Sequence, residues 1–344
     1  MMYNIILEES PERLLGLMMG CGSFVTAAAP AIGPTFGGIM TQYFTWRYIF
    51  ICVLPVIVLA SFIGYFCMSE QIINKHEKFD LLSFIAVALA FVSLIMGFSN
   101  LNQIVDDLVF VLGCFIIGII SLYYFTKRQL HIKNSLIRIE IFNHKGFTFH
   151  TLAIMFLQMT TLGYGLLLPT FVQIVLKQPA TDAGVVLLPG AIVGAVFAPI
   201  GGLILDRLGA KKPIILGLCC SFIATFCFLF FFKNLTYQSC ILFYFIYSLG
   251  IGLIVGNTMT SAMSHLSKNL QADGNATLQT LMQLSGGIGT SITATILAFV
   301  QQGTNLYDGT NRGALFVLIF LMFNINIVIL SQYFAFKGGK KNEL

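Results

Sequence analysis

Long apolar runs separated by short polar connections extend along the whole chain. A membrane-spanning helix needs about 20 mostly apolar residues, and ten stretches meet that requirement. They lie near residues 14–40, 48–68, 81–99, 108–126, 147–176, 183–205, 213–232, 238–264, 275–300 and 312–336. Each run is far longer than the roughly ten alternating residues of a barrel strand. The pattern therefore predicts an all-α polytopic membrane protein with about ten transmembrane helices.

The composition supports the same class of protein. Hydrophobic residues make up 57% of the 344 and charged residues only 10%, whereas soluble domains average about 25% charged residues. The eight cysteines are scattered and show no metal-ligand spacing, so we expect no metal and no cofactor. The net charge of +5 does not indicate nucleic-acid binding, because the basic residues lie in short connections between apolar runs.

The basic residues predict the orientation of the chain. With the N-terminus in the cytoplasm and ten crossings, the inner segments hold 15 of the 19 lysines and arginines. The outer segments hold only Arg47, Lys177, Lys233 and Arg312. Cytoplasmic connections of membrane proteins carry such an excess of positive charge. We therefore expect a multi-pass protein in the lipid bilayer of the plasma membrane, with both termini cytoplasmic.

The acidic residues limit the chemistry. All 14 aspartates and glutamates fall in predicted connections or at helix ends, so no carboxylate lies mid-membrane, where burial would suit it to carry a proton. Intramembrane proteases need catalytic carboxylates or metal ligands within their spans. The sequence also lacks the Gly-x-x-x-x-Gly-Lys-Ser/Thr loop that cradles nucleotide phosphates. We expect neither an enzyme, with no catalytic residue, nor an ATP-driven pump.

The first apolar stretch carries a glycine-proline motif. Residues 28–38 read AAPAIGPTFGG, and the block WRYIF follows at residues 46–50. The first segment resembles the antiporter signature G-x-x-x-G-P-x-x-G-G of the major facilitator superfamily, with Ala29 in place of the upstream glycine. The second resembles the stretch that follows the signature in the fourteen-span drug:proton antiporter subfamily, with Val53 in place of its asparagine. We expect a proline kink and close helix packing at the signature residues, which are Gly33, Pro34, Gly37 and Gly38.

A second motif lies between two later apolar stretches. Residues 201–213 read GGLILDRLGAKKP and resemble the superfamily loop G-x-x-x-D-R-x-G-[RK]-[RK], with a departure at Ala210. The matching residues are Gly202, Asp206, Arg207, Gly209 and Lys211. We expect Asp206 to cap the helix that follows. We expect the basic residues to pair with acids on neighbouring helices, so that the loop acts as a cytoplasmic conformational switch.

The resemblance implies a major-facilitator-type helical bundle whose N-terminal half is incomplete. Members of the fourteen-span subfamily have about four spans before the glycine-proline signature, whereas here the signature lies in the first span. The expected parts are a residual two-span N-terminal bundle at 1–80, two linker spans with a cytoplasmic loop at 81–146, and a six-helix C-terminal bundle at 147–344.

The resemblance also implies a function. Transporters of this type bind substrate between two halves near the membrane midplane. The polar residues expected to line that cavity are Gln158, Gln173, Asn257, Gln279 and Gln283. The implied activity is secondary transport, namely proton-coupled efflux of lipophilic or cationic small molecules by alternating access. The alternative is a truncated, non-transporting remnant, or a partner subunit that needs the missing helices from another chain or assembles as an oligomer.

Overall fold

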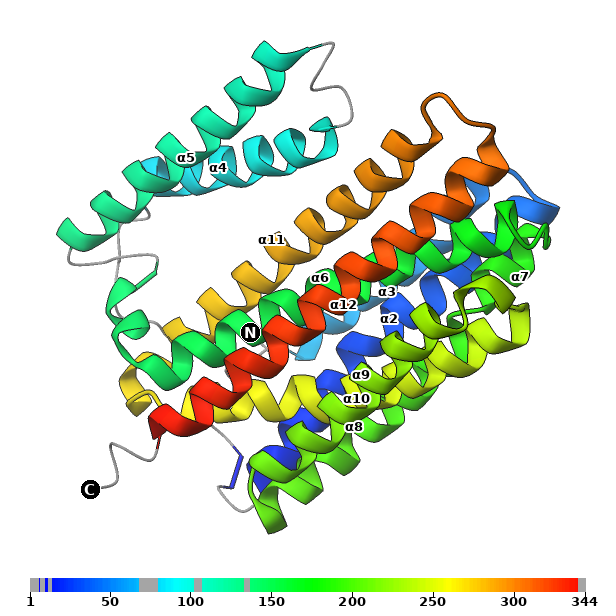
Figure 1. The fold of residues 1–344 in the computed structure, drawn as a ribbon. Coiled ribbons are helices and arrows are strands. Elements are labelled where there is room, and N and C mark those ends of the chain that lie inside the picture. The colour runs from blue at the N-terminus through cyan, green and yellow to red at the C-terminus, as the bar shows by residue number, and fades with distance from the viewer. Residues whose placement is uncertain are drawn as a thin grey trace.

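The computed structural model describes residues 6, 10–11, 14–67, 80–101, 107–132 and 137–339, without the side chains of residues 23, 27–32, 67 and 338–339. The described residues form helices and no strands (Figure 1). The long helices are α2 (Leu15–Tyr43), α3 (Arg47–Cys67), α4 (Leu81–Ser99), α5 (Leu108–His131), α6 (Lys145–Ile174), α8 (Leu188–Leu208), α9 (Lys211–Phe230), α10 (Tyr237–Ser264), α11 (Lys268–Gln301) and α12 (Leu306–Gly339). Short helical segments are η3 (Ile139–Asn143), α7 (Ala180–Val185) and η4 (Phe232–Asn234).

The predicted all-α membrane architecture is confirmed. Within the described residues, 9 helical segments are long and apolar enough to cross a membrane, and α7 and α8 together form one of them. The remaining expected span, near residues 14–40, corresponds to α2, which contains the shorter apolar segment Leu15–Thr26. Hydropathy locates these helices well because a spanning helix must satisfy every backbone polar group internally and therefore forms one long continuous run.

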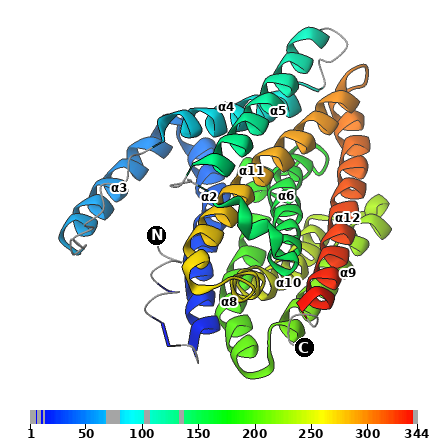
Figure 2. The same ribbon diagram turned by 90° about the vertical axis from the view of Figure 1, so that its left-hand side faces the viewer.

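The core of the bundle lies between α6, α9, α10 and α12. Helix α6 packs along α12 and α11, and α10 packs along α8 and α9. Large side chains fill the space between these helices, among them Tyr164, Tyr247 and Phe228, which are fully buried. Helix α2 lies against α8, α7 and α10, and the two views in Figures 1 and 2 agree on this placement.

Two parts of the chain lie outside this core. Helix α3 extends away from the bundle (Figure 2), and none of its described side chains is buried. Helices α4 and α5 form a hairpin that rests on α11, where Ser99 Oγ lies 2.8 Å from Ser291 Oγ and Thr295 donates a 2.8 Å hydrogen bond to the carbonyl of Phe98. The expected division of the chain at residues 80 and 146 stays a prediction.

Charged side chains divide between the two ends of the bundle. The end where α6 and α11 begin and α8 and α12 finish carries most of the described basic residues, namely Lys127, Arg128, Arg138, Lys145, Arg207, Lys211, Lys212, Lys268 and Lys337. The opposite end carries Arg47, Lys177, Lys233 and Arg312. We call the first the basic end. This asymmetry agrees with the predicted orientation, which stays a prediction.

A partly buried ion pair joins the beginning of α4 to the end of α5. Arg128 binds Asp80 with two nitrogens, Nε at 3.0 Å from Oδ2 and Nη2 at 3.0 Å from Oδ1. Gln129 donates a 2.8 Å hydrogen bond to Ser83 beside this pair. The hydrogen bonds from Arg128 and then from Ser83 lower the pKa of Asp80 from 3.8 to about 2. Bidentate arginine-carboxylate pairs of this kind also fix geometry.

The substitution Arg128→Gln should lower the melting temperature of the purified protein by a few degrees, because it removes both charged hydrogen bonds to Asp80. The neighbouring Lys127→Gln serves as control. Because the pKa of Asp80 is lowered, the pair stabilises the folded state above pH 3.8 and loses that effect as the pH falls towards 2. The difference between the wild type and Arg128→Gln should therefore be constant from pH 7 to 5. Equal losses in both variants would contradict this assignment.

Candidate functional site

Helices α2 and α8 approach each other through glycines. A Cβ added to Gly20 on α2 would lie 2.6 Å from the carbonyl oxygen of Ala198 on α8. A Cβ added to Gly202 on α8 would clash with the carbonyl of Gly16 on α2. Side chains at these positions would push the helices apart. The two backbones therefore touch, which is how helices pack closely in a membrane.

Asp206 joins the end of α8 to the beginning of α2. Its Oδ1 accepts a 2.9 Å hydrogen bond from the backbone N–H of Gly16, and its Oδ2 accepts a 3.0 Å bond from that of Leu17. These two N–H groups belong to the first turn of α2, where the helix dipole favours a negative charge. The expectation that Asp206 caps the following helix is wrong, because α9 starts after Ala210 without a side-chain cap. The carboxylate binds a helix 190 residues away instead.

The other residues of this loop have simpler roles. Gly209 ends α8 with φ +81, a left-handed conformation that a side chain would strain. Arg207 and Lys211 are exposed. The expectation that they pair with acids is wrong for the described residues, whose ion pairs are Asp80–Arg128 and Asp273–Arg138. Of the motif residues, Gly202 and Asp206 make the contact with α2.

The glycine-proline signature lies on α2 at the end opposite Asp206. Gly38 faces α7, where an added Cβ would lie 2.6 Å from the carbonyl oxygen of Ala180. Thr35 donates a 3.1 Å hydrogen bond to the carbonyl of Gly184. Helix α2 continues through Pro34 without ending, and the carbonyl of Pro34 contacts the position where Gly184 would carry a Cβ.

The signature glycines do not share one packing role. The expectation of close approach is wrong for Gly33 and Gly37, because no described atom beyond the adjoining backbone of α2 lies within 4 Å of a Cβ added to either. Of the three signature glycines, Gly38 alone contacts a neighbouring backbone. The difference arises because successive residues of a helix point 100° apart, so Gly37 and Gly38 face different surroundings.

A cavity of about 260 Å³ lies between α2, α6, α8, α10 and α11. Its lining combines amides and hydroxyls with aromatic rings and small residues. The lining residues are Thr26, Gln158, Thr161, Leu162, Ala191, Gly194, Ala195, Ala198, Tyr244, Tyr247, Ser248, Ile251, Gly252, Val255, Gln279, Met282 and Gln283. No Asp, Glu, Lys or Arg belongs to this described lining.

Of the five residues predicted to line a substrate cavity, three line the cavity just described, and their role stays a prediction. Gln158 on α6 and Gln279 and Gln283 on α11 line the cavity. Gln173 does not, because it is exposed at the far end of α6. Asn257 does not either, because it is 2% exposed and packs towards Gly201 of α8, with its amide donating 2.7 Å to the carbonyl of Leu253.

Buried tyrosines form the aromatic wall of the cavity, and the sequence reasoning missed two of them. Tyr244 and Tyr247 lie three residues apart on α10 and therefore on one face. The ring of Tyr247 lies 4.7 Å from that of Tyr164, and its hydroxyl lies 2.9 Å from Thr161 Oγ1. This spacing in an apolar helix was the signal that could have found them.

Acids and histidines are few within the described spans. Every described acid lies at a helix end or in a connection, as expected, and these are Asp80, Asp107, Glu140, Asp182, Asp206, Asp273 and Asp308. His150 is the fully buried member of the described histidines. Its Nε2 lies 3.0 Å from Ser261 Oγ, its Nδ1 has no described hydrogen-bond partner, and its ring stacks on that of His265 at 5.6 Å.

Comparison with known sequences points to one family. A sequence profile described as Major Facilitator Superfamily matches residues 1–290. The chain is 30% identical over 313 residues to a lincomycin resistance protein LmrB of Listeria monocytogenes, which covers 91% of this chain and 66% of that protein. It is 32% identical over 304 residues to the Bacillus subtilis protein of the same name, covering 87% and 63%.

A more distant relative carries a similar name. The chain is 23% identical over 308 residues to a multidrug resistance protein B homolog of Mycobacterium tuberculosis, covering 86% of this chain and 56% of that protein. The chain therefore spans less than two thirds of the length of these relatives.

The substitution Gly38→Ala should destabilise the protein by about 1–3 kcal/mol, because the new methyl group overpacks the contact with Ala180. The adjacent Gly37→Ala should change stability by less than about 0.5 kcal/mol, because its methyl group meets open space. Thermal unfolding of both variants in detergent measures the difference. Equal effects would show that α2 does not rest on α7 through Gly38.

The substitution Asp206→Asn should lower stability by about 1–2 kcal/mol, because the charge that faces the first turn of α2 is lost and one of the two N–H groups loses its acceptor. Asp182→Asn, at the opposite end, is the matched control. The readout is thermal unfolding together with the rate of proteolysis before residue 16. A stable Asp206→Asn protein with unchanged proteolysis would contradict the conclusion that Asp206 holds the first turn of α2.

Proposed function

We propose, since the chain belongs to the major facilitator superfamily, that it acts as a secondary transporter that exports lipophilic or cationic small molecules in exchange for protons. The family consists of membrane transporters and not of enzymes. The names of the relatives refer to resistance to lincomycin or to several drugs, and we extend drug efflux to this chain as part of the proposal.

The cavity is the observation that carries the proposal. It is lined by the amides of Gln158, Gln279 and Gln283 together with Tyr244 and Tyr247. Tyrosine faces attract cations, and amide oxygens solvate them without a fixed charge. Apolar walls with few polar groups are typical of sites for small lipophilic ligands. A cavity lined in this way suits a lipophilic cation better than a sugar or an anion.

The elements around the cavity suit alternating access. Helix α2 forms one wall of the cavity and is held by Asp206 at its beginning and by Gly38 near its end. The contact at Gly38 joins two backbones, and the contact at Asp206 joins a backbone to one carboxylate. Each contact can therefore form or break as a unit. We propose that α2 and α8 separate at the basic end in one state and close in the other.

Proton coupling needs a group that titrates inside the bundle. The described acids lie at helix ends, and the buried imidazole of His150 has one nitrogen without a described partner. The charge of a histidine changes near neutral pH when water reaches its ring, whereas burial disfavours the charged form, so His150 would take up a proton in the state in which the bundle opens to it. We assign the proton to His150 within this proposal.

Expression of this chain in cells should produce efflux of a lipophilic cationic dye that stops when an uncoupler removes the proton gradient. Gln283→Ala and Gln279→Ala should slow efflux by about 5–30-fold, the effect of losing about 1–2 kcal/mol of substrate interaction. Gln173→Ala, which removes the same side chain away from the cavity, should leave the rate unchanged. His150→Gln should abolish the response to the gradient while downhill dye movement continues.

Absence of efflux from cells in which the chain is inserted in the membrane would contradict the proposal. It would favour the alternative of a subunit that assembles with another chain. The specific support for that alternative is α3, none of whose described side chains is buried. Equal effects of Gln173→Ala and Gln283→Ala would show that the substrate does not use this cavity.

A further inference from the structure

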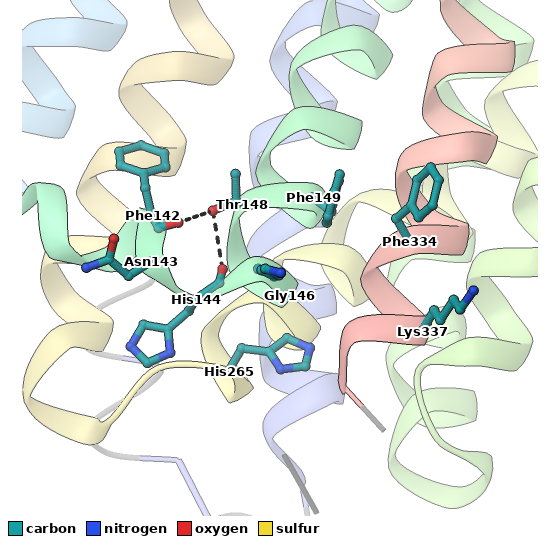
Figure 3. Close-up of a pocket in the computed structure, with 10 residues that line it drawn as sticks. Phe142, Asn143, His144, Gly146, Thr148, Phe149, His265, Phe334 and Lys337 are labelled. Atoms are coloured by element: carbon teal, nitrogen blue, oxygen red, sulfur yellow. Dashed lines mark hydrogen bonds between the residues drawn. The ribbon is translucent and has the colours of Figure 1, made fainter. Parts of the chain in front are cut away.

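A second pocket opens at the basic end of the bundle, away from the central cavity (Figure 3). It has a volume of about 720 Å³ and lies between the η3–α6 junction, the end of α10 and the last turns of α12. Its lining residues are Phe142, Asn143, His144, Lys145, Gly146, Thr148, Phe149, His265, Phe334 and Lys337. None of them lines the central cavity, so the proposed transport function leaves this pocket unexplained.

Basic groups from three elements converge on this pocket. Lys145 comes from the first turn of α6, Lys337 from the last turn of α12, and His144 and His265 flank them. The described lining contains no aspartate or glutamate to neutralise them. Lys145 and Lys337 are both exposed and line the pocket from two helices that pack together, α6 and α12. An anion that entered would meet two ammonium groups and up to two imidazole N–H donors.

The beginning of α6 adds backbone donors to this set. The N-cap residue His144 makes no side-chain cap hydrogen bond, and the first turn holds no acidic residue. The ring of His265 lies directly on Gly146, where an added Cβ would approach its Nε2 to 2.6 Å. Figure 3 shows Gly146 between the two histidines on one side and Lys337 on the other. Helix N-termini attract phosphate oxygens through their free N–H groups and dipole.

Aromatic rings form the other side of the pocket. Phe149 of α6 and Phe334 of α12 stack with ring centroids 5.5 Å apart, and Phe334 is 40% exposed. Both rings lie further along the apolar helices than Lys337, as Figure 3 shows, and Lys145 is the first residue of α6. A ligand bound here would meet positive charge at the helix ends and apolar surface immediately beyond. This polarity matches that of a phospholipid and not that of a soluble anion.

We propose that this pocket binds the headgroup of an anionic phospholipid from the adjacent leaflet. Lys145, Lys337 and the first N–H groups of α6 hold the phosphate, and the upper parts of the acyl chains lie over Phe149 and Phe334. Basic pockets between membrane helices bind such headgroups by charge and by hydrogen bonding. The bound lipid would bridge α6 and α12, which pack together along their length.

Thermal unfolding of the purified chain in detergent, titrated with lipid, tests the site. Phosphatidylglycerol should stabilise the protein at concentrations at least about tenfold below those needed for phosphatidylcholine with the same acyl chains. The double variant Lys145→Gln/Lys337→Gln should weaken the phosphatidylglycerol effect roughly 30-fold, since each lysine near an anionic headgroup contributes about fivefold. The phosphatidylcholine effect should not change.

Three controls make the test decisive. Lys212→Gln removes a lysine at the same end but outside the pocket and should behave as wild type, and Lys145→Arg/Lys337→Arg should keep the preference. Equal stabilisation by the two lipids would overturn the proposal, and so would an equal loss in Lys212→Gln, which would indicate diffuse charge attraction. Stabilisation by sodium phosphate alone at the same concentrations would overturn it in favour of a soluble anion.

Discussion

Direct backbone contact between α2 and α8 is the constraint on which the rest of the structure depends. Helices in a bilayer gain no hydrophobic free energy by associating, so close packing and hydrogen bonds must hold them. The glycines at 16, 20 and 202 let the two backbones meet, and Asp206 can then reach the first N–H groups of α2. A larger side chain at any of these glycines would move α2 outward. The wall of the central cavity and the carboxylate contact would then be lost together.

Close packing also brings a few polar but uncharged groups to the cavity. Gly194 of α8 lies so near α10 that an added Cβ would come within 2.8 Å of the carbonyl of Ser248. This approach brings α10 close to α8, and Tyr244 and Tyr247 line the cavity together with the amides of α6 and α11. Amides and phenols cost little to place within the bundle, whereas a charged side chain at the bilayer centre costs about 2.5–3.5 kcal/mol or more.

Hydropathy predicted where helices lie, but it could not predict which helices touch. The run at 147–176 became α6 within two residues at each end, because the bilayer sets the length of such a run. The partner of Asp206 lies 190 residues away, and no local pattern encodes that contact. Gln158 and Gln173 differ mainly in depth, since Gln173 lies about 22 Å further along the same helix. Their residue type and apolar surroundings are alike, so the sequence could not separate them.

The distribution of charge limits where a conformational change can be controlled. The described acids all lie at helix ends, and the central cavity holds none. A carboxylate at a helix end keeps part of its hydration and meets a helix dipole, which is worth about 0.3–2 kcal/mol. A contact of that energy can be broken reversibly, and it is strong enough to change the ratio of two conformational states several-fold. Asp206 is the described acid that joins two long helices through backbone N–H groups alone, so a charge-based change in the α2–α8 contact must act through it.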